Sequence, residues 1–391
     1  MTRVSVFLCL LTLAAPALAA TSARPSNGVA GFEAAAGWAL FRHDWGGALS
    51  RDQPGGALGA MFDARSCDSC HVGAGPGRVG PDAIGAGMIV RFGQADGAGD
   101  PVYGRTLQSG ARPGLKAEGT ALIRWDAHGD LRASAIVFGD LNYGPLAPAS
   151  RAGLRRAPAL FGLGLLETIP EAEVLARKSG HPSWIASADG TRALGRFGWK
   201  AGAATLSMQI ATAFQRDFGI ASSVLPETFA DCTPPEKDCR AATAKSAVLP
   251  DRLLDAVVAF VRYLRPPPPL DERSAGFAVF RAAGCMGCHD NLKGADGAPV
   301  HAFTDLRLHD MGPDLDDGIA EDGARPGEWR TAPLWDVAES LAQGGLLHDG
   351  RARNIAEAVA AHGGEAAAAR ARFNALNAKD REALEAFLLR R

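Results

Sequence analysis

The stretch Cys285-Met286-Gly287-Cys288-His289 decides how the rest of the chain is interpreted. Two cysteines three positions apart, followed at once by a histidine, form the pattern of a c-type haem attachment site, in which the histidine is the proximal iron ligand. The same pattern occurs again at Cys67-Asp68-Ser69-Cys70-His71. With 7 Cys and 9 His in 391 residues, chance gives on the order of 0.003 such motifs. The sequence therefore predicts two covalently bound haem c groups.

Two other interpretations of the CXXC pairs are a zinc site and a pair of disulfides. Both leave the adjoining histidines unexplained. They also leave unexplained the N-terminus, where Arg3, an apolar run over residues 4–15 and Ala17-Leu18-Ala19 have the pattern of a cleaved signal peptide. We therefore expect residues 1–20 to be a signal peptide and the mature protein to lie in the periplasm. No other uncharged run is long enough to span a membrane, so we expect no membrane span after cleavage.

Composition limits the remaining choices. The net charge of −2 gives no reason to expect a nucleic-acid partner. The 47 glycines and 24 prolines point to a loop-rich chain. Once Cys9 has left with the signal peptide and four cysteines have bound haem, only Cys232 and Cys239 remain. In an oxidising compartment this close pair predicts a local disulfide, with two free thiols as the alternative.

The pattern along the chain predicts a mainly α fold with two cytochrome c-like haem domains, the first enlarged by loop and short β insertions. A proline run at residues 266–269 separates residues 21–265 from residues 270–391. Apolar spacing predicts helices over residues 31–45, 203–218, 251–264, 274–283 and 378–389, and a further one from Pro170 towards Gly180. Short strands are expected over residues 88–92, 121–125 and 135–138, the last two forming a hairpin.

Several runs carry a family resemblance: residues 162–167 (GLGLLE), 195–201 (GRFGWKA), 308–312 (LHDMG), 329–335 (WRTAPLW), 347–352 (LHDGRA) and 362–366 (HGGEA). They resemble the di-haem oxidoreductase family, also labelled thiol oxidoreductase, which is related to bacterial di-haem cytochrome c peroxidases and MauG. The likeness covers nearly the whole mature chain. To the true peroxidases it is patchy and strongest in the C-terminal half. The resemblance fixes the cofactors better than the reaction.

The sixth ligand of each iron decides what the protein can do. For the second haem the candidates are His301, His309, Met311, His348 and His362. In the related peroxidases a His-Asp-Gly segment is followed, 14 residues after its histidine, by this ligand. His348-Asp349-Gly350 puts His362 at that spacing. The resemblance therefore implies His362, with Met311 as the alternative, and a supporting role for His309 and His348.

At the first haem the resemblance implies a glutamine and a glutamate ten residues apart, and Gln108 and Glu118 have this spacing. A buried glutamate with a raised pKa suits proton transfer during peroxide cleavage. The alternative is an ordinary solvated loop. A second alternative is that Met88, 17 residues after His71, ligates this iron and closes it to substrate. No histidine lies between His71 and His128, so the nearby loop offers no resting histidine ligand, and in this respect the sequence is similar to MauG, whose first haem is kept open.

Further residues complete the expected site. Trp199, Trp329 and Trp335 are candidates for the space between the haems, with ordinary core packing as the alternative. The basic candidates for haem propionate partners are Arg196, Lys200, Arg330 and Arg351. Related peroxidases hold a calcium ion between their domains, for which Asp314, Asp316 and Asp317 are candidates, with a solvated acidic loop as the alternative.

These observations predict a periplasmic di-haem c-type oxidoreductase. The leading hypothesis is a peroxidase-like enzyme (EC 1.11.1-like). It would take electrons from a small soluble electron-transfer protein through the second haem and pass them to peroxide, or another small substrate, at the first. The alternatives are a MauG-like oxidase of a protein or thiol substrate, and a non-enzymatic di-haem electron carrier in which Met88 ligates the first iron.

Overall fold

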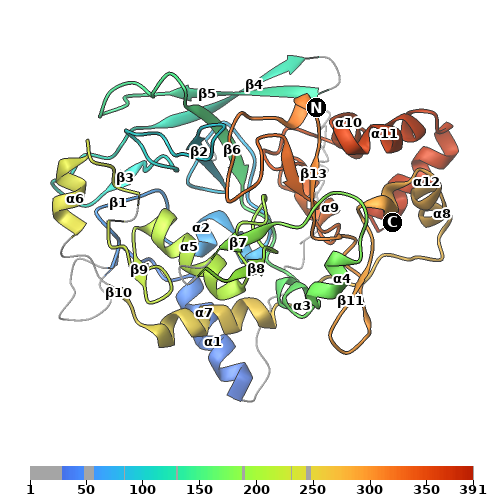
Figure 1. Ribbon diagram of the computed structural model, residues 1–391, viewed down its shortest axis with the longest axis horizontal. Coiled ribbons are helices and arrows are strands. Elements are labelled where there is room, and N and C mark those ends of the chain that lie inside the picture. Colours follow the sequence, from blue (N-terminus) through green and yellow to red (C-terminus); the bar gives the residue numbers. More distant parts are fainter. Residues whose placement is uncertain are drawn as a thin grey trace, which may run out of the picture.

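The computed structural model describes residues 29–47, 57–82, 84–128, 131–186, 190–229, 231–243 and 248–390. The expected signal peptide, residues 1–20, lies outside this described part. Helices make up 33% of the structure and strands 17%. Helix therefore exceeds strand, as the sequence predicts, and about half of the chain is irregular, in keeping with its glycine and proline content (Figure 1).

Most of the helices are short. In chain order the described helices are α1 (Val29–Phe41), α2 (Cys67–Cys70), α3 (Leu163–Glu167), α4 (Glu171–Leu175), α5 (Leu206–Phe218), α6 (Lys237–Thr243), α7 (Asp251–Tyr263), α8 (Ala275–Ala282), α9 (Val337–Ala342), α10 (Ile355–Ala360), α11 (Ala367–Asn374) and α12 (Ala378–Leu388). The expected helices over residues 203–218, 251–264, 274–283 and 378–389 are confirmed as α5, α7, α8 and α12. The helix expected after Pro170 is only the short α4, which ends before Gly180.

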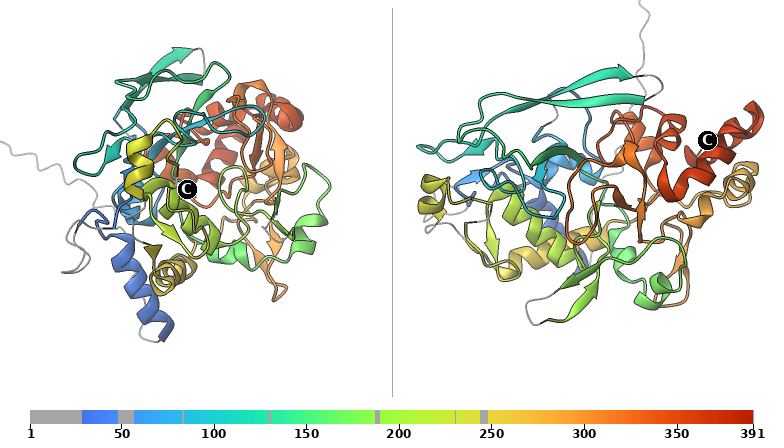
Figure 2. Two further views of the ribbon diagram at one scale, coloured as in Figure 1. Left: turned by 60° about the vertical axis from the view of Figure 1, so that its left-hand side comes forward. Right: turned by 45° about the horizontal axis from the view of Figure 1, so that its top comes forward.

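In the described residues the strands pair two by two rather than forming a large sheet. The antiparallel pairs are β1 (Met61–Phe62) with β3 (Gly110–Ala111), β2 (Met88–Gly93) with β6 (Arg151–Arg156), β4 (Ala121–His128) with β5 (Leu131–Phe138), β7 (Trp184–Ala186) with β8 (Arg192–Leu194), β11 (Leu292–Lys293) with β12 (Pro299–Val300), and β13 (Leu308–Asp310) with β14 (Glu328–Arg330); β9 (Ala221–Ser222) and β10 (Val248–Leu249) are parallel. The expected hairpin is confirmed as β4–β5, which lies along one edge of the molecule (Figure 2).

The largest hydrophobic core forms where α1, α5 and α7 pack together. Apolar residues recur at helical spacing in α7 and form one face, on which Val257, Val258 and Val261 are buried. Gly37 lets α1 approach α7 closely, because a Cβ at this position would lie 1.9 Å from the Ala256 carbonyl oxygen. Some side chains of this core also line the cavity described below.

A second core lies between α8 and α12, next to the second CXXCH motif. The Ser274 side chain caps α8 by accepting a hydrogen bond from the Phe277 N–H. A Cβ at Gly276 would lie 2.0 Å from the Ala383 carbonyl oxygen, so the two helices touch through their backbones. The rings of Phe280 and Phe387 pack beside them at a tilt of 56°, with their centroids 5.5 Å apart. This packing fixes the end of α8 and hence the position of Cys285.

Successive side chains of β2 point to opposite faces of the strand, and the two faces lie in different environments. Met88, Val90 and Phe92 are almost fully buried in a cluster beneath the β4–β5 hairpin. Ile89 and Arg91 point to the opposite face and line the cavity. Successive side chains of this strand therefore belong to different parts of the protein.

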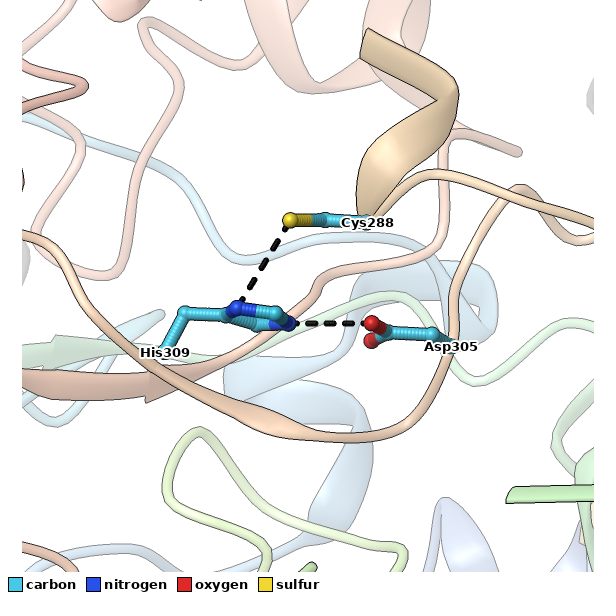
Figure 3. A group of neighbouring side chains, drawn as sticks. All are labelled: Cys288, Asp305 and His309. Carbon is cyan, nitrogen blue, oxygen red and sulfur yellow. Dashed lines mark hydrogen bonds and ion pairs between the residues drawn. The ribbon is translucent and has the colours of Figure 1, made fainter. Parts of the chain in front are cut away.

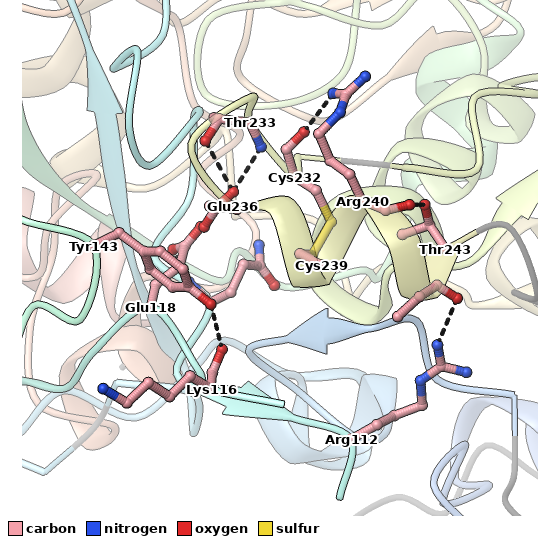
Figure 4. The surroundings of a disulfide bond; sticks show 12 residues. Arg112, Lys116, Glu118, Tyr143, Cys232, Thr233, Glu236, Cys239, Arg240 and Thr243 are labelled. Carbon is pink, nitrogen blue, oxygen red and sulfur yellow. Dashed lines mark hydrogen bonds between the residues drawn. A yellow bond between two sulfur atoms is a disulfide. The ribbon is translucent and has the colours of Figure 1, made fainter. Parts of the chain in front are cut away.

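The expected disulfide between Cys232 and Cys239 is confirmed, with the two Cα atoms 5.8 Å apart. It ties the loop before α6 to the body of that helix (Figure 4). None of the described helices is both long and apolar enough to cross a membrane.

Candidate haem-binding cavity

One cavity of about 730 Å³ connects the two CXXCH motifs. Its walls include Cys67, Cys70 and His71 of the first motif and Cys285, Cys288 and His289 of the second. Most of the remaining lining residues are apolar; α5, α10 and α11 supply some of them, and loop segments such as residues 157–161 and 331–336 supply many others. A large apolar cavity with a few convergent polar groups is typical of a cofactor site. Motifs that lie far apart in the sequence therefore open onto one shared space.

The first motif is held by local hydrogen bonds. The Ser66 side chain caps α2 by accepting from the Ser69 N–H. His71 follows the helix, and its Nδ1 lies 2.8 Å from the Pro158 carbonyl oxygen. Burial lowers the pKa of His71 to about 4, so the ring is neutral at pH 7. A neutral ring that donates through Nδ1 keeps the Nε2 lone pair for a metal ion.

The second motif repeats this arrangement. Its cysteines flank the single turn η2 (Cys285–Gly287), and the His289 Nδ1 lies 2.9 Å from the Phe303 carbonyl oxygen. Burial lowers the pKa of His289 to about 4. The two proximal histidine candidates therefore share one tautomer and one kind of backbone partner, although their elements differ.

His362 also lines the cavity, just beyond the end of α10. Its Nδ1 lies 2.6 Å from the Ala358 carbonyl oxygen, and burial lowers its pKa. Its charge would be felt at His289, so the two rings are electrostatic neighbours. His362 thus has the same neutral, Nδ1-donating form as the two motif histidines, on the same cavity as His289.

Three buried cations on the cavity wall have no carboxylate partner among the described residues: Arg156, Lys200 and Arg330. Each donates only to backbone carbonyl oxygens. Burial lowers the pKa of Arg156 and Arg330 to about 10 and that of Lys200 to about 8. Unpaired buried positive charge is costly, and an anionic ligand relieves it. The wall therefore fits a ligand with carboxylates, as haem propionates are.

The other two expected propionate partners, Arg196 and Arg351, do not combine a place on the cavity wall with the lack of a carboxylate partner. Arg196 donates to the Leu166 carbonyl oxygen and does not line the cavity. Arg351 is paired with Asp349.

Trp329 and His348 form a stacked pair on the cavity wall. Their ring centroids are 3.6 Å apart, with an angle of 11° between the ring planes. The Lys200 ammonium and the Arg155 guanidinium lie 4.1 and 4.8 Å from the Trp329 ring centroid. Burial first, then Arg155, lower the pKa of His348 well below its usual value. The stack is therefore a neutral aromatic pair held beside two cations.

His309 lies beside the second motif (Figure 3). Its Nε2 is 2.9 Å from Asp305 and its Nδ1 is 3.0 Å from Glu365 and 3.6 Å from the Cys288 sulfur. Burial alone would lower the pKa of His309, but hydrogen bonds to Asp305 and Cys288 outweigh it and raise the pKa to about 10. Cys288, Asp305 and His309 are close enough together to hold a metal ion. If Cys288 carried a thioether, it could no longer bind a metal ion as a thiolate. His309 would then hold this loop in place through its hydrogen bonds to Asp305 and Glu365.

Gln108 and Glu118 do not line the haem cavity. They line a separate pocket of about 10 Å³ next to the disulfide, enough for one water. The Glu118 Oε2 accepts a 2.6 Å hydrogen bond from the Gln108 N–H, and the Gln108 side chain donates to the Arg216 carbonyl oxygen at 2.8 Å. Glu236 faces Glu118 in this pocket. The two residues are buried together, as expected, but not above the first haem site.

Met88 is likewise on the wrong face to ligate an iron in this cavity. Its side chain is fully buried in the cluster beneath the β4–β5 hairpin. The alternation of β2 turns it away from Ile89 and Arg91, which do line the cavity. The methionines that line the cavity are Met208 of α5 and Met311. Of the other candidates, His301 bonds Glu272 at 2.6 Å and does not line the cavity.

The carboxyl group that does line the cavity near the first motif is Asp217, at the end of α5. Its backbone carbonyl oxygen accepts hydrogen bonds from the Asp63 and Ala64 N–H groups, just before Cys67. Sequence reasoning missed Asp217 because it lies in an ordinary amphipathic helix without a motif. Only its contact with residues 63 and 64, far away in the sequence, reveals its position.

The three aspartates considered for calcium do not converge. Asp314 pairs with Arg370 at 3.7 Å, and Asp317 pairs with Arg155 at 2.5 Å. Asp316 caps a tight turn by accepting from the Gly318 N–H. Within the described residues, Cys288, Asp305 and His309 form the one acidic or histidine cluster compact enough for a metal ion. The structure therefore does not support the calcium expectation.

A cavity shared by two CXXCH motifs and lined by ligand-competent histidines defines a candidate di-haem protein. Residues 274–390 match the family model described as "Di-haem oxidoreductase, putative peroxidase". This match confirms, for the C-terminal part of the chain, the resemblance predicted from the sequence. No curated protein sequence matches the chain.

Two solved structures show a weak likeness. Hydrazine synthase of Kuenenia stuttgartiensis, pressurised with xenon, is 14% identical over 100% of this chain and 99% of its own, with a TM-score of 0.33. A MauG-like protein associated with microbial copper homeostasis is 17% identical over 63% of this chain and 76% of its own, also with a TM-score of 0.33. A TM-score of this size is too low for either structure to bear on the fold of this chain.

Proposed function

We propose that this chain is a periplasmic di-haem c-type oxidoreductase with peroxidase-like activity. Residues 1–20 would be its signal peptide, and residues 21–265 and 270–391 its two cytochrome c-like haem domains. One observation carries the proposal: both CXXCH motifs open onto a single apolar cavity, and both motif histidines hold Nδ1 against a backbone carbonyl so that Nε2 is free for iron.

In this proposal the two haem sites differ in their sixth ligand. His362 shares the cavity with His289 and has the same tautomer, so it is assigned as the sixth ligand of the second iron. The histidine residues that line the cavity offer no such counterpart near His71, because His348 is stacked on Trp329. The first iron is therefore assigned the open position that binds substrate.

Bound haem would supply the redox chemistry, and the chain supplies orientation and charge. Arg156, Lys200 and Arg330 would hold the propionates. The Trp329–His348 stack offers an aromatic contact on the shared wall. The overall reaction takes two electrons from a small soluble electron-transfer protein and two protons from solvent. It breaks the O–O bond of hydrogen peroxide and yields two molecules of water.

Two alternatives use the same haems. A MauG-like oxidase would pass oxidising equivalents to a protein or thiol substrate instead of consuming donor electrons. A non-enzymatic electron carrier would need a sixth ligand on the first iron. Met88 is turned away from the cavity, so Met208 is the methionine that this alternative requires.

EPR spectroscopy of the oxidised and half-reduced protein tests the proposal in wild type, Met88→Ala and Met208→Ala. We expect one high-spin, peroxide-reactive haem in wild type and no change in either variant. Two low-spin haems in wild type, with a high-spin signal gained only in Met208→Ala, would establish the electron carrier. Peroxide consumption without oxidation of the added electron donor would favour the MauG-like oxidase.

A further inference from the structure

Two aspartates from distant segments meet at the first CXXCH motif. Asp63 lies four residues before α2, and Asp217 is the second-last residue of α5; the Asp63 N–H donates to the Asp217 carbonyl oxygen at 3.0 Å. Asp63 is 8% exposed, and its Oδ1 is buried without a hydrogen-bond partner. The two carboxyl groups interact strongly, so they act as a pair.

The pair faces the cavity through Asp217, which is a lining residue. The described residues supply neither a hydrogen-bond donor nor an ion-pair partner to the Asp217 carboxylate. Its negative charge is felt at the sulfurs of both Cys67 and Cys70, which places it close to the attachment edge of the first haem site. An unpaired carboxylate here can therefore contact a small molecule in the cavity.

Charged groups from four segments face Asp217. Arg91 from β2 and Arg216 from α5 favour its charged form, whereas Asp231 from the loop after β9 disfavours it. Asp63 is the fourth. Burial outweighs the two cations and raises the pKa of Asp217 to about 6. Burial, followed by the charge of Asp217, raises the pKa of Asp63 well above its usual value. Two neighbouring buried carboxylates cannot both ionise easily, so the pair keeps one proton near neutral pH.

We propose that Asp217, backed by Asp63, is the acid/base group of the first haem site, in the role that the sequence assigned to Glu118. This inference rests on the proposed function. The Asp217 carboxylate accepts a proton from one oxygen of hydrogen peroxide and delivers it to the other, which leaves as water when the O–O bond breaks. The electron-transfer protein supplies both electrons, and two solvent protons complete the second water and restore the balance.

The test uses the haem-loaded ferric protein and two readouts. The first is the pH dependence of cyanide association, since hydrogen cyanide must give up its proton on binding. In wild type the rate should rise with a midpoint near pH 6, where Asp217 becomes a base. Asp217→Asn should remove this rise. The second readout is peroxide turnover, which Asp217→Asn should lower by about 10²–10⁴-fold, the usual contribution of general acid–base catalysis.

Two more variants complete the design. Asp63→Asn removes the second ionisable carboxyl of the pair, so the midpoint near pH 6 should stay, any second step at higher pH should disappear, and the maximal rate should be kept. Asp100→Asn is the control: Asp100 is a buried carboxylate that is bound by backbone N–H groups and does not line the cavity, so the cyanide profile should stay as in wild type.

A wild-type profile in Asp217→Asn, with normal haem content, would overturn the role of Asp217 and leave the proposed function intact. A second ionisation step that persists in the Asp63→Asn profile would overturn the pairing. If neither haem of the wild-type protein binds cyanide or reacts with peroxide, the proposed function fails first, and this inference fails with it.

Discussion

Replacing Glu118 with glutamine should stabilise the protein at alkaline pH rather than weaken it. Glu118 and Glu236 are both fully buried. The Glu118 Oε2 accepts from the Gln108 N–H and the Glu236 Oε2 accepts from the Thr233 N–H, each at 2.6 Å. The second oxygen of each carboxyl has no protein donor (Figure 4). The simplest arrangement is a shared proton, with Glu118 as the acid that donates to Glu236.

The pKa values give the sign of the effect. Burial, followed by the charge of Glu236, raises the pKa of Glu118 well above its usual value. The folded protein therefore holds a proton that the unfolded chain releases at about pH 4.3, the ordinary value for glutamate. Stability from this group is complete below that pH and falls as the pH rises towards the folded-state pKa. The loss is about 1.4 kcal/mol per pH unit for one proton.

A glutamine amide can accept from Gln108 and donate to Glu236 without any proton uptake. In Glu118→Gln the contribution of this group to the pH slope should therefore vanish. Glu118→Leu is the contrasting variant. It leaves the Glu236 carboxylate buried without its partner, which should cost about 3 kcal/mol.

Urea unfolding followed by circular dichroism between pH 5 and pH 8 measures both effects. The shared-proton reasoning is refuted if Glu118→Gln keeps the wild-type slope, or if it is as unstable as Glu118→Leu throughout. Because Glu118 lies outside the haem cavity, the haem content of all three proteins should be equal.

The remaining predictions concern the second haem and the disulfide. His362→Gly should convert the second haem from low-spin to high-spin in the EPR spectrum, and an unaltered spectrum would remove His362 as its ligand. Replacing Cys232 and Cys239 with serine opens a loop of sequence separation 7, which should lower the free energy of unfolding by about 2.4 kcal/mol from loop entropy; a loss below about 0.5 kcal/mol in urea unfolding would contradict a stabilising role.

The elements that could be predicted from the sequence are those set by local patterns. The apolar spacing of α7 and the pairing of the neighbouring strands β4 and β5 depend on residues close together in the chain, and both predictions are confirmed. The CXXCH motifs work in the same way, because the attachment chemistry itself requires the spacing. These signals depend on neighbours in the chain and not on the final packing.

Where an expectation about the site is wrong, the residue lies in the expected element or contact, but its side chain points into a different space. Met88 lies in the expected strand, but one step of alternation decides whether its sulfur enters the cavity or the core beneath the hairpin. Gln108 and Glu118 are in contact, as their spacing suggested, yet the disulfide loop and Glu236 enclose them on the far side of α5. A spacing of ten residues carries no information about which space the two side chains share.

The charges on the cavity wall favour one orientation of a haem at the first site. Arg156, Lys200 and Arg330 have no carboxylate partners among the described residues and need negative charge nearby, whereas Asp217 has no cation bonded to it and sits beside the sulfurs of the first motif. In the proposed haem c, thioethers at Cys67 and Cys70 would fix the vinyl edge, and the propionates would leave from the opposite edge. The carboxylates of the cofactor would thereby be kept away from Asp63 and Asp217. The carboxyl pair would then be free to exchange protons with a small substrate, and the cofactor, instead of the protein, would neutralise the buried cations.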